Sequence, residues 1–483
     1  MNLVLLRAMF SYCHLASAFV FCFALFFSTA LFAASDSEVS ANMIRAGQMF
    51  AQQELPSLDG TVASQQSPNA PATLDITQAV NRAVQWHPDI AEVVGKLYEQ
   101  AEGVNVARSK YYPKISAGMN NGMTNSSTNS GYNPSFVLSL SQMLYDFGKV
   151  DSSVRAAEAS VAKEQANVLV SIDTIAHDTA AAVVQVQGYQ QLVKIAEAQL
   201  EALNNIGKLA RQRNDEGASS LSDVVQTETR IEGARSTLMQ YQANLDRWRA
   251  TLSTYLGWRD LKEVSNKFPV TLSKSCQVAQ PDYRLIPSVL AAWAQVNQAQ
   301  ANLDNANSQM TPTISLEPEV THYLTNNYSN NQVLDRTQYG AWVKVEMPLY
   351  QGGGLTASRN AAAHTLESAN AAVRNAQLDA QQKLSESQNE EMSLARTLVI
   401  QSRQQKLAER TRELYQDQYL QLGTRPLLDV LNSEQEIYQA RFTEQQTISQ
   451  IHTLQLDCLY STGFMRSAFA LNNQTIQTVE IQP

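Results

Sequence analysis

The sequence predicts a mainly helical protein with a small β part, in which one structural unit is used twice. Long stretches rich in Ala, Gln, Glu, Leu and Ser are typical of long helices. Two pairs of segments alternate apolar and polar residues, which is typical of β-hairpins. The segment "GASSLSDVVQTE" (217–228) returns as "GTRPLLDVLNSE" (423–434), 206 residues further on (423 − 217 = 206). Such self-similarity indicates an internal repeat.

The N-terminal region predicts a secretory signal followed by a flexible leader. Residues 1–34 contain Arg7, an apolar stretch at 15–27 and small residues at the end, as signal peptides do. An uncleaved membrane anchor is the alternative, which the short apolar stretch disfavours. Residues 35–73 are polar and irregular, so we expect no regular structure there.

The first repeat is expected over 74–258. It begins with a helical pattern that starts at Asp75 or Thr77 and breaks near His87 and Pro88. The elements that follow are two strands around a turn-rich loop, a very long helix, a turn and a second helix. Their expected ranges are 111–120 and 135–148 for the strands, 121–134 for the loop, 149–213 for the long helix, 214–220 for the turn and 221–256 for the second helix.

The second repeat is expected over 283–465, after a connector at 259–282 and before a C-terminal tail at 466–483. "PKIS" at 113 matches "PTIS" at 312, and "LYDFG" at 144 matches "LYQGG" at 349. The expected elements are helices at 283–310 and 355–420, strands at 310–320 and 339–354, and a last helix that ends near 460.

The two hairpins have the features of membrane strands. Each strand has close to ten residues, about the span of a tilted strand in a bilayer. Aromatic residues near the strand ends predict a girdle at the membrane interfaces: Tyr111, Tyr112, Tyr145, Phe147, Tyr323, Tyr339, Trp342 and Tyr350. Soluble hairpins with buried aromatic residues are the alternative. Because open strand edges are costly in lipid, membrane hairpins would require several chains to form one barrel.

Several functions are disfavoured. The net charge of −9, without a Lys and Arg cluster, disfavours nucleic-acid binding. The histidines after the signal lack metal-ligand spacing, and neither a G-x-S-x-G motif nor a phosphate loop is found. We therefore predict no enzyme activity, no cofactor and no metal. For Cys276 and Cys458, two unpaired thiols are favoured over a bridge.

The twofold repeat, the "MPLYQGG" junction at 347–353 and "LGTRPLLDVL" at 422–431 together resemble the TolC family of bacterial outer-membrane exit ducts, over about residues 74–465. The resemblance implies a homotrimer with a 12-stranded outer-membrane β-barrel, four strands from each chain, continued by an α-helical coiled-coil tunnel in the periplasm. The connector and the C-terminal tail would lie in or near a belt around the tunnel. Outer-membrane lipid would surround the barrel.

The resemblance also places the two repeated turns at the periplasmic tips. It implies a gate at the aperture formed by Asp429, Asn432, Arg425 and Asp223. Arg425 would bind Asp223 of the neighbouring tip in the closed state. Asn432 stands where the family's best-known member has a second Asp, so one of two acidic rings is lost. The tip turns, where a partner would dock, comprise Gly217, Ser222, Gly423, Thr424 and Leu420. Leu420 replaces the family's Tyr, although Tyr419 is adjacent. An ordinary solvated pair of helix turns is the alternative.

The implied function is that of the outer-membrane channel of a tripartite export system. Its partners would be a periplasmic adaptor protein and an inner-membrane transporter, either ATP-driven (ABC) or proton-driven. Type I protein secretion is the first expectation and multidrug efflux is the alternative. A periplasmic coiled-coil adaptor is the alternative of another class, but it would not explain two hairpins flanked by aromatic residues.

Overall fold

The computed structural model describes residues 71–125, 130–258, 261, 263–278, 280–325 and 335–482. The chain divides into two units, Met1–Pro68 and Asn69–Pro483, and all described residues belong to the second. The expected signal peptide, and the leader up to residue 70, lie outside the described residues.

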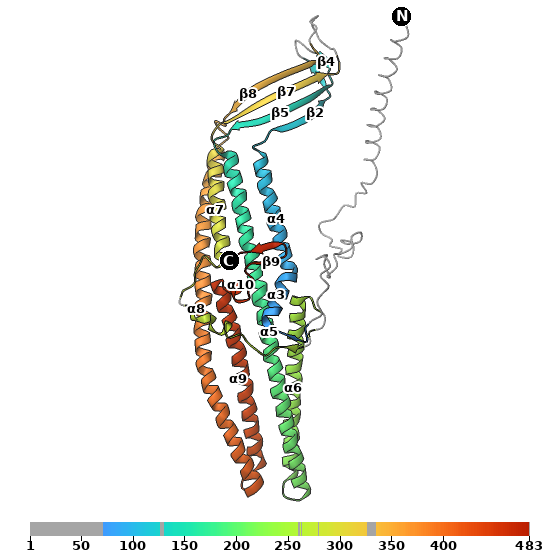
Figure 1. Cartoon of the computed structure of the whole chain (residues 1–483), viewed down its shortest axis with the longest axis vertical. Helices are drawn as coiled ribbons and strands as arrows, with labels where there is room; N and C mark the ends of the chain where they lie inside the picture. Colours follow the sequence, from blue (N-terminus) through green and yellow to red (C-terminus); the bar gives the residue numbers. More distant parts are fainter. Residues whose placement is uncertain are drawn as a thin grey trace, which may run out of the picture. The chain divides into compact units, whose positions relative to one another are not determined.

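Four long helices form most of the described unit, as the sequence predicts (Figure 1). They are α5 (Lys149–Asp215), α6 (Leu221–Leu256), α8 (Gly354–Asp417) and α9 (Leu427–Thr462). With 67 residues, α5 is roughly 100 Å long at 1.5 Å per residue. Among the described residues, no helix combines the length and the apolar character needed to cross a membrane.

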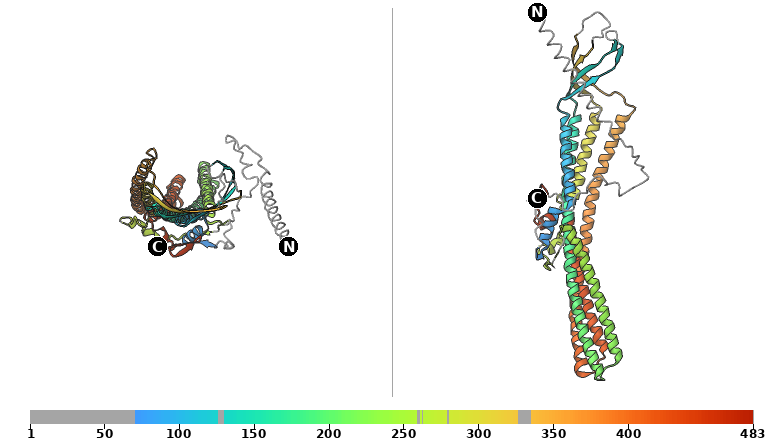
Figure 2. Two further views of the ribbon diagram at one scale, coloured as in Figure 1. Left: turned by 90° about the horizontal axis from the view of Figure 1, so that it is seen from above. Right: turned by 90° about the vertical axis from the view of Figure 1, so that its right-hand side faces the viewer.

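Three shorter helices complete the helical part: α3 (Ile76–Trp86), α4 (Pro88–Ser109) and α7 (Pro287–Ser308). Asp75 is the cap of α3, because its carboxylate accepts the backbone N–H of Thr77 at 3.1 Å. In Figure 1, α4 and α7 run beside the half of α5 and α8 nearer the sheet, and α6 and α9 run beside the other half. Figure 2 shows that these helices lie on a curve, with one concave side.

The strands form one antiparallel sheet in the order β2-β5-β7-β8. Their bounds are Lys114–Asn120 for β2, Ser135–Tyr145 for β5, Thr313–Tyr323 for β7 and Thr337–Glu346 for β8. A further pair, β3 (Met123–Asn125) and β4 (Ser130–Tyr132), extends the first hairpin. The turn-rich loop expected at 121–134 therefore contains two short strands that the sequence analysis did not predict. A two-stranded ribbon is held by backbone hydrogen bonds, so it needs no apolar alternation in the sequence.

The sheet has one apolar and one polar face. Ala117 lies opposite Leu138, Leu138 opposite Val320, and Val320 opposite Tyr339, so these four residues share one face. The large apolar residues of that face are Ile115, Met119, Phe136, Leu138, Leu140, Ile314, Leu316, Val320, Tyr339, Val343 and Val345. The opposite face carries Ser116, Ser139, Glu317, Glu319, Lys344 and Glu346. An apolar face left open to solvent requires a partner or lipid.

The main core lies where the first described residues, from 71 on, and the C-terminal segment pack on the middle of α5. The elements there are α10 (Met465–Ala468), β9 (Gln474–Ile476), β10 (Val479–Ile481), and the parallel pair of β1 (Thr73–Leu74) with β6 (Glu263–Val264). We call these elements, α3 and the described part of the connector (259–282) the belt. Ile76, Phe469 and Ile172 are fully buried in its core.

A disulfide joins Cys276 to Cys458, which corrects the expectation of two unpaired thiols. The short helix η1 (Leu272–Gln277) of the connector lies along α9, where Ser275 donates to the carbonyl of Gln455 at 2.6 Å. This contact brings residues 182 apart in sequence to a Cα separation of 5.2 Å. The spacing of two cysteines in a sequence cannot reveal such a long-range contact.

Two ionic contacts, one buried and one half-buried, hold α5 to the C-terminal part of the chain. Arg466 of α10 donates to Oδ2 of Asp173 at 2.7 Å. His177, one turn further along α5, contacts Asp457 of α9 at 2.7 Å and its neighbour Asp178 at 3.0 Å. Burial alone would lower the pKa of His177. The hydrogen bonds to Asp178 and Asp457 outweigh burial and raise that pKa to about 9.

We expect the belt to lose stability as the pH rises from about 6.5 to about 9. Folding raises the pKa of His177, so the protonated side chain stabilises the folded state. This stabilisation is complete below the pKa of His177 in the unfolded chain, about 6.5, and it is lost as the pH rises through the pKa in the folded state. The loss is at most about 3 kcal/mol in the free energy of unfolding. Denaturant unfolding of the wild type and of His177→Asn should show this pH dependence in the wild type only. His364→Asn is the matched control, because His364 is exposed, and it should keep the pH dependence of the wild type. The same slope in His177→Asn would contradict the assignment.

Candidate functional site

The candidate site consists of the two turns that close the helical hairpins at the end away from the sheet (Figure 1). Gly217 and Gly423 occupy equivalent positions and have φ values of 73° and 62°. An ideal Cβ on either residue would meet no atom within 4 Å, so the backbone conformation, not space, requires glycine at both positions. The glycine that begins each copy of the repeated tip segment, at 217 and at 423, therefore has a local structural cause.

Asp223 stabilises its own turn. Its carboxylate accepts the Ser219 hydroxyl at 2.7 Å and the backbone N–H of Ser220 at 3.2 Å, and Ser220 caps α6 in return. The hydrogen bond from Ser219 lowers the pKa of Asp223. Ser222 lies beside the cap, with its hydroxyl 2.7 Å from that of Ser220. This first turn is thus a complete capping box.

Arg425 binds within the second turn and not to Asp223 of the same chain. Its guanidinium donates to Asp429 at 2.9 Å and to Gln418 at 2.9 Å, and it lies over the ring of Tyr415 at 4.3 Å. The expected pair of Arg425 with Asp223 is therefore not made between the two tips of one chain. A pair between neighbouring chains stays a prediction.

Tyr419 connects the two helical hairpins, α5–α6 and α8–α9, whereas Leu420 is exposed. The chain forms a π-helical turn, η2 (Gln418–Leu422), before Gly423. Tyr419 is buried in a cluster with residues of α5, α6 and α9. Arg213 of α5 lies over its ring at 4.6 Å and donates to its carbonyl at 3.4 Å. The presence of Tyr419 next to Leu420 was the signal for this contact, and nothing in the sequence indicated Arg213.

Arg230 forms a second connection, which the sequence did not indicate. Its guanidinium reaches from α6 to Asn432 of α9 at 3.1 Å and also donates to Gln435. It lines an open groove of about 730 Å³ between α5, α6 and α9. Asn432 therefore accepts a hydrogen bond at the position where the acidic ring is lost. A carboxylate there would form an ion pair with Arg230.

The predicted aromatic girdle divides between the two faces of the sheet. Tyr145 pairs with Ile314, and Tyr339 pairs with Val320, so both lie on the apolar face. Trp342 lies opposite Glu317 on the polar face and covers Gly340. Tyr323 shares that face at the far end of β7, opposite Ser135. This placement weighs against Trp342 and Tyr323 as lipid contacts, because alternate residues of a strand face opposite sides.

The remaining girdle residues lie where the strands join the helices. They are exposed, and the set comprises Tyr111, Tyr112, Phe147 and Tyr350. The rings of Tyr145 and Phe147 meet edge to face at 4.6 Å. A girdle at the junction between sheet and helices stays a prediction.

These features define an elongated helical protein with an amphipathic sheet at one end and paired turns at the other. A profile described as "Outer membrane efflux protein" matches residues 79–258 and 286–456. The chain therefore belongs to the outer membrane efflux protein family, which confirms the resemblance to TolC-type channels. The expected location in the bacterial outer membrane, with a periplasmic extension, is confirmed. Membership of a family of efflux proteins also supports a role without catalysis.

The chain is similar to several curated relatives. It is 25% identical over 416 residues to the outer membrane efflux protein BepC of Brucella suis, covering 84% of this chain and 89% of BepC. It is 26% identical over 227 residues to the probable efflux pump outer membrane protein TtgC of Pseudomonas putida, covering 44% of each chain. Protein CyaE of Bordetella pertussis is 24% identical over 298 residues, covering 58% of this chain and 61% of CyaE.

Solved structures share the fold. The outer membrane protein VceC of Vibrio cholerae superimposes with a TM-score of 0.70 at 17% identity, covering 80% of this chain and 96% of VceC. The open state of the Neisseria gonorrhoeae MtrE outer membrane channel gives a TM-score of 0.67 at 17% identity, covering 80% and 89%. At this level of identity the comparison establishes the fold alone.

We expect Arg230→Ala to loosen the two tips relative to each other. Its hydrogen bonds to Asn432 and Gln435 join α6 to α9 across a groove, and each is worth about 1 kcal/mol. Spin labels at Ser222→Cys and Thr424→Cys would report the distance between the tips by pulsed electron resonance. The distribution should broaden in Arg230→Ala. It should not change in Arg235→Ala, because among the described residues Arg235 binds Glu232 of its own helix and none of α9. Equal distributions in all three proteins would show that Arg230 does not join the tips.

Proposed function

We propose that this protein is the outer-membrane duct of a tripartite export system, and that three copies form one continuous channel. A periplasmic adaptor would dock at the tips, and an inner-membrane transporter would supply the substrate. The observation that carries the proposal is the concave arrangement of long helices joined to a sheet with one open apolar face (Figure 2). In a single chain, the curve of helices does not close into a tube, and the sheet keeps two edge strands, β2 and β8.

The sheet edges support assembly. β2 and β8 are the two outer strands, and the apolar face that they border is largely exposed. An unpaired edge within lipid leaves backbone groups without hydrogen bonds. Pairing β2 of one copy with β8 of the next removes both edges. Three chains with four strands each then give a closed 12-stranded barrel, a size found among outer-membrane proteins.

Exposed apolar residues on α8 and α6 support the same assembly. Ile400, Leu407 and Leu414 follow one another at seven-residue steps on α8, and Leu221 and Val225 are exposed on α6. Their relative exposures range from 44% to 68%. Arg403 and Arg410 share the stripe on α8, and Glu228 and Glu232 share the one on α6. Within the chain, Arg410 pairs with Glu413, Glu228 with Arg211 and Glu232 with Arg235, so the apolar residues of the two stripes carry the proposed helix–helix contact between copies.

The internal repeat gives the register of that contact. α8 begins 205 residues after α5 (354 − 149 = 205), and α9 begins 206 after α6 (427 − 221 = 206). Inside one chain, Ala210 of α5 and Leu427 of α9 belong to the same buried cluster. The equivalent pair between copies is Tyr415 (210 + 205) with Leu221 (427 − 206). Leu414, beside Tyr415, therefore lies close to Leu221 of the next copy.

We expect Leu414→Cys together with Leu221→Cys to cross-link neighbouring copies under oxidation. The products on a denaturing gel should be dimers and trimers, with no larger species, because a ring of three closes. Leu414→Cys with Met239→Cys is the matched control, since position 239 is exposed on α6 but 18 residues out of register (239 − 221 = 18). Monomers only from the first pair, or equal products from both, would contradict the proposed seam.

The tips would form the closed end of the duct. In a threefold assembly, three copies of Asp429 approach one axis, and each is held by Arg425 of its own chain. The arginine thus offsets part of the negative charge that would attract cations. Asn432 adds no charge to this ring, and its hydrogen bond to Arg230 ties α9 to α6. We propose a constriction that the polar contacts of Arg425 and Arg230 keep narrow.

We expect a small, stable single-channel conductance for the purified full chain in a planar bilayer, and a larger one for Arg425→Ala. The substitution removes the contacts to Gln418, Asp429 and Tyr415 that shape the second tip. Arg359→Ala, exposed near the sheet end of α8 and away from the tips, is the control and should leave the conductance unchanged. Equal conductances for wild type and Arg425→Ala would keep the duct and remove the latch. A folded trimer without conductance would contradict the duct.

The cargo separates two versions of the proposal. Type I protein secretion is the expectation from the sequence and drug efflux is the alternative, and the names of the relatives BepC and TtgC favour efflux. A neighbouring gene for an ATP-driven transporter with a large repeat-rich protein would favour secretion. A neighbouring gene for a proton-driven pump would favour efflux.

A further inference from the structure

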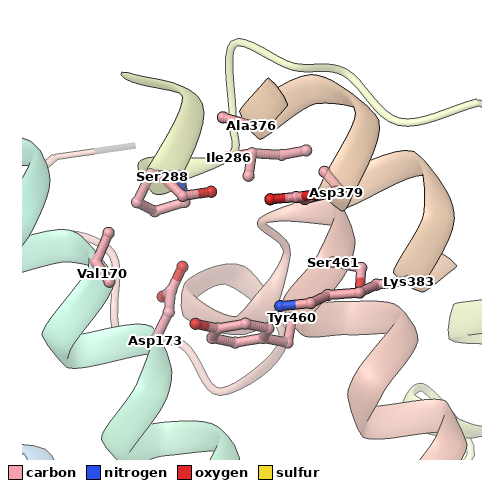
Figure 3. A pocket seen from close by; sticks show the side chains of 11 residues that line it. Val170, Asp173, Ile286, Ser288, Ala376, Asp379, Lys383, Tyr460 and Ser461 are labelled. Atoms are coloured by element: carbon pink, nitrogen blue, oxygen red, sulfur yellow. The ribbon is translucent and has the colours of Figure 1, made fainter. Parts of the chain in front are cut away.

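A cavity of about 170 Å³ lies where α5, α7, α8 and α9 meet (Figure 3). One part of its wall is apolar and comprises Val170, Ile286, Pro287, Ala376 and Ala380. The other part is polar and comprises Asp173, Ser288, Asp379, Lys383, Tyr460 and Ser461. The cavity is remote from the tip turns and is not part of the proposed gate.

Asp173 presents an unused acceptor to this cavity. Its side chain is 2% exposed, and Arg466 donates only to Oδ2. The other oxygen, Oδ1, is buried without a hydrogen-bond partner among the described residues. Figure 3 shows the carboxylate pointing into the cavity from α5. A buried carboxylate oxygen is stabilised by a donor, so its isolation indicates that the site accepts one from outside the chain.

The surrounding groups favour a cation over an anion. Asp379 also points toward the cavity, and the hydroxyl of Tyr460 lies on the side of Asp173 (Figure 3). An anion would face two carboxylates. A metal ion is a poor fit, because the described residues offer no cluster of three His, Cys, Asp or Glu side chains. The apolar wall suits a molecule with a hydrocarbon body.

We propose that this cavity binds a small protonated primary amine with an apolar body. The ammonium group donates to Oδ1 of Asp173, and its charge is attracted by Asp379 at the rim. The hydrocarbon part lies against Val170 and Ile286. Lys383 also lines the cavity, and Figure 3 shows its ammonium group beside the ring of Tyr460, so it opposes the bound charge and limits affinity.

Binding should depend on pH. Burial raises the pKa of Asp173 to about 7, although Arg466 opposes the rise. The charged and titratable groups around it are Arg466 from α10, Asp379 and Lys383 from α8, and Tyr460 from α9; α7 contributes the uncharged Ser288. His177 of the same helix faces Tyr460 at 5.3 Å and stays protonated up to about pH 9. Affinity should therefore fall as the pH decreases below about 7, since the amine stays charged and the carboxylate does not.

The test is isothermal titration calorimetry of the purified full chain in detergent. The probes are n-butylamine, 1-butanol and butyrate at pH 8 and pH 6. We expect butylamine to bind at least tenfold more tightly than either isostere at pH 8, and several-fold more weakly at pH 6. Tighter binding of butyrate, or equal binding of butylamine and butanol, would overturn the proposal. No measurable binding by the folded protein would show that the cavity holds only water, which would overturn it as well.

Matched variants locate the binding. Asp173→Asn should abolish it, but that substitution also breaks the ion pair with Arg466. Ala376→Leu fills the cavity and leaves the ion pair intact, so it should weaken the binding of butylamine at least tenfold. Ala371→Leu, exposed on the same helix, should have no effect. Lys383→Met should tighten binding several-fold. Unchanged affinity in Ala376→Leu, or weaker affinity in Lys383→Met, would contradict the assignment.

Discussion

The long helix α5 joins the two repeats, because α7 of the second repeat packs along it near the sheet and α9 packs along it toward the tips. The arrangement of the tips depends on the contact of α5 with α9. These helices are antiparallel, and their contact extends from the buried tip cluster around Leu203 and Leu431 to the belt, where His177 meets Asp457. Close approach requires small residues: a Cβ on Gly188 would lie 2.4 Å from the Ser449 hydroxyl oxygen. In the repeat, α8 corresponds to α5 and α6 corresponds to α9, so a contact of the same type can form between α8 and α6. Within one chain, α6 already packs on the far side of α5. The repeat therefore leaves one interface open, and this open interface favours a closed ring of copies over a monomer.

The elements that follow from local rules could be predicted from the sequence. The bounds of α6 agree with the expected range, and the break at His87 and Pro88 follows from the chemistry of proline. Asp429 belongs to the second tip, as expected. What the sequence could not give are contacts that depend on the third dimension. The Cys276–Cys458 bridge depends on where the connector crosses α9. The side on which Trp342 lies depends on the register of β8, and it became clear only from its pairing with Glu317.

The two tips show how a similar motif can serve different roles. In the first, Asp223 is used by its own capping box, and in the second the equivalent Asp429 is held by Arg425, because Pro426 at the cap position offers no side-chain hydrogen bond. The sequence comparison matched Arg425 to Asp223 across the tips. Local bonding wins within one chain because both partners find closer groups: a serine hydroxyl at 2.7 Å for Asp223 and a carboxylate at 2.9 Å for Arg425. Arg213 and Arg230 instead make the connections between the tips, because their side chains reach across to the other helical hairpin.

The belt and the tips differ in how firmly they are held, and this difference suits a duct that opens at one end. At the belt, a disulfide holds the connector to α9, and the buried Asp173–Arg466 pair holds α10 to α5. The main apolar core packs these elements together. At the tips, the links between hairpins are a small apolar cluster and two arginines that bond mainly to neutral acceptors. Exposed polar contacts of that kind contribute about 1 kcal/mol each, so an adaptor needs only modest binding energy to rearrange them. In the proposed duct, the tips would therefore move while the belt stays intact, because the firmest contacts of α5 and α9 lie at the belt.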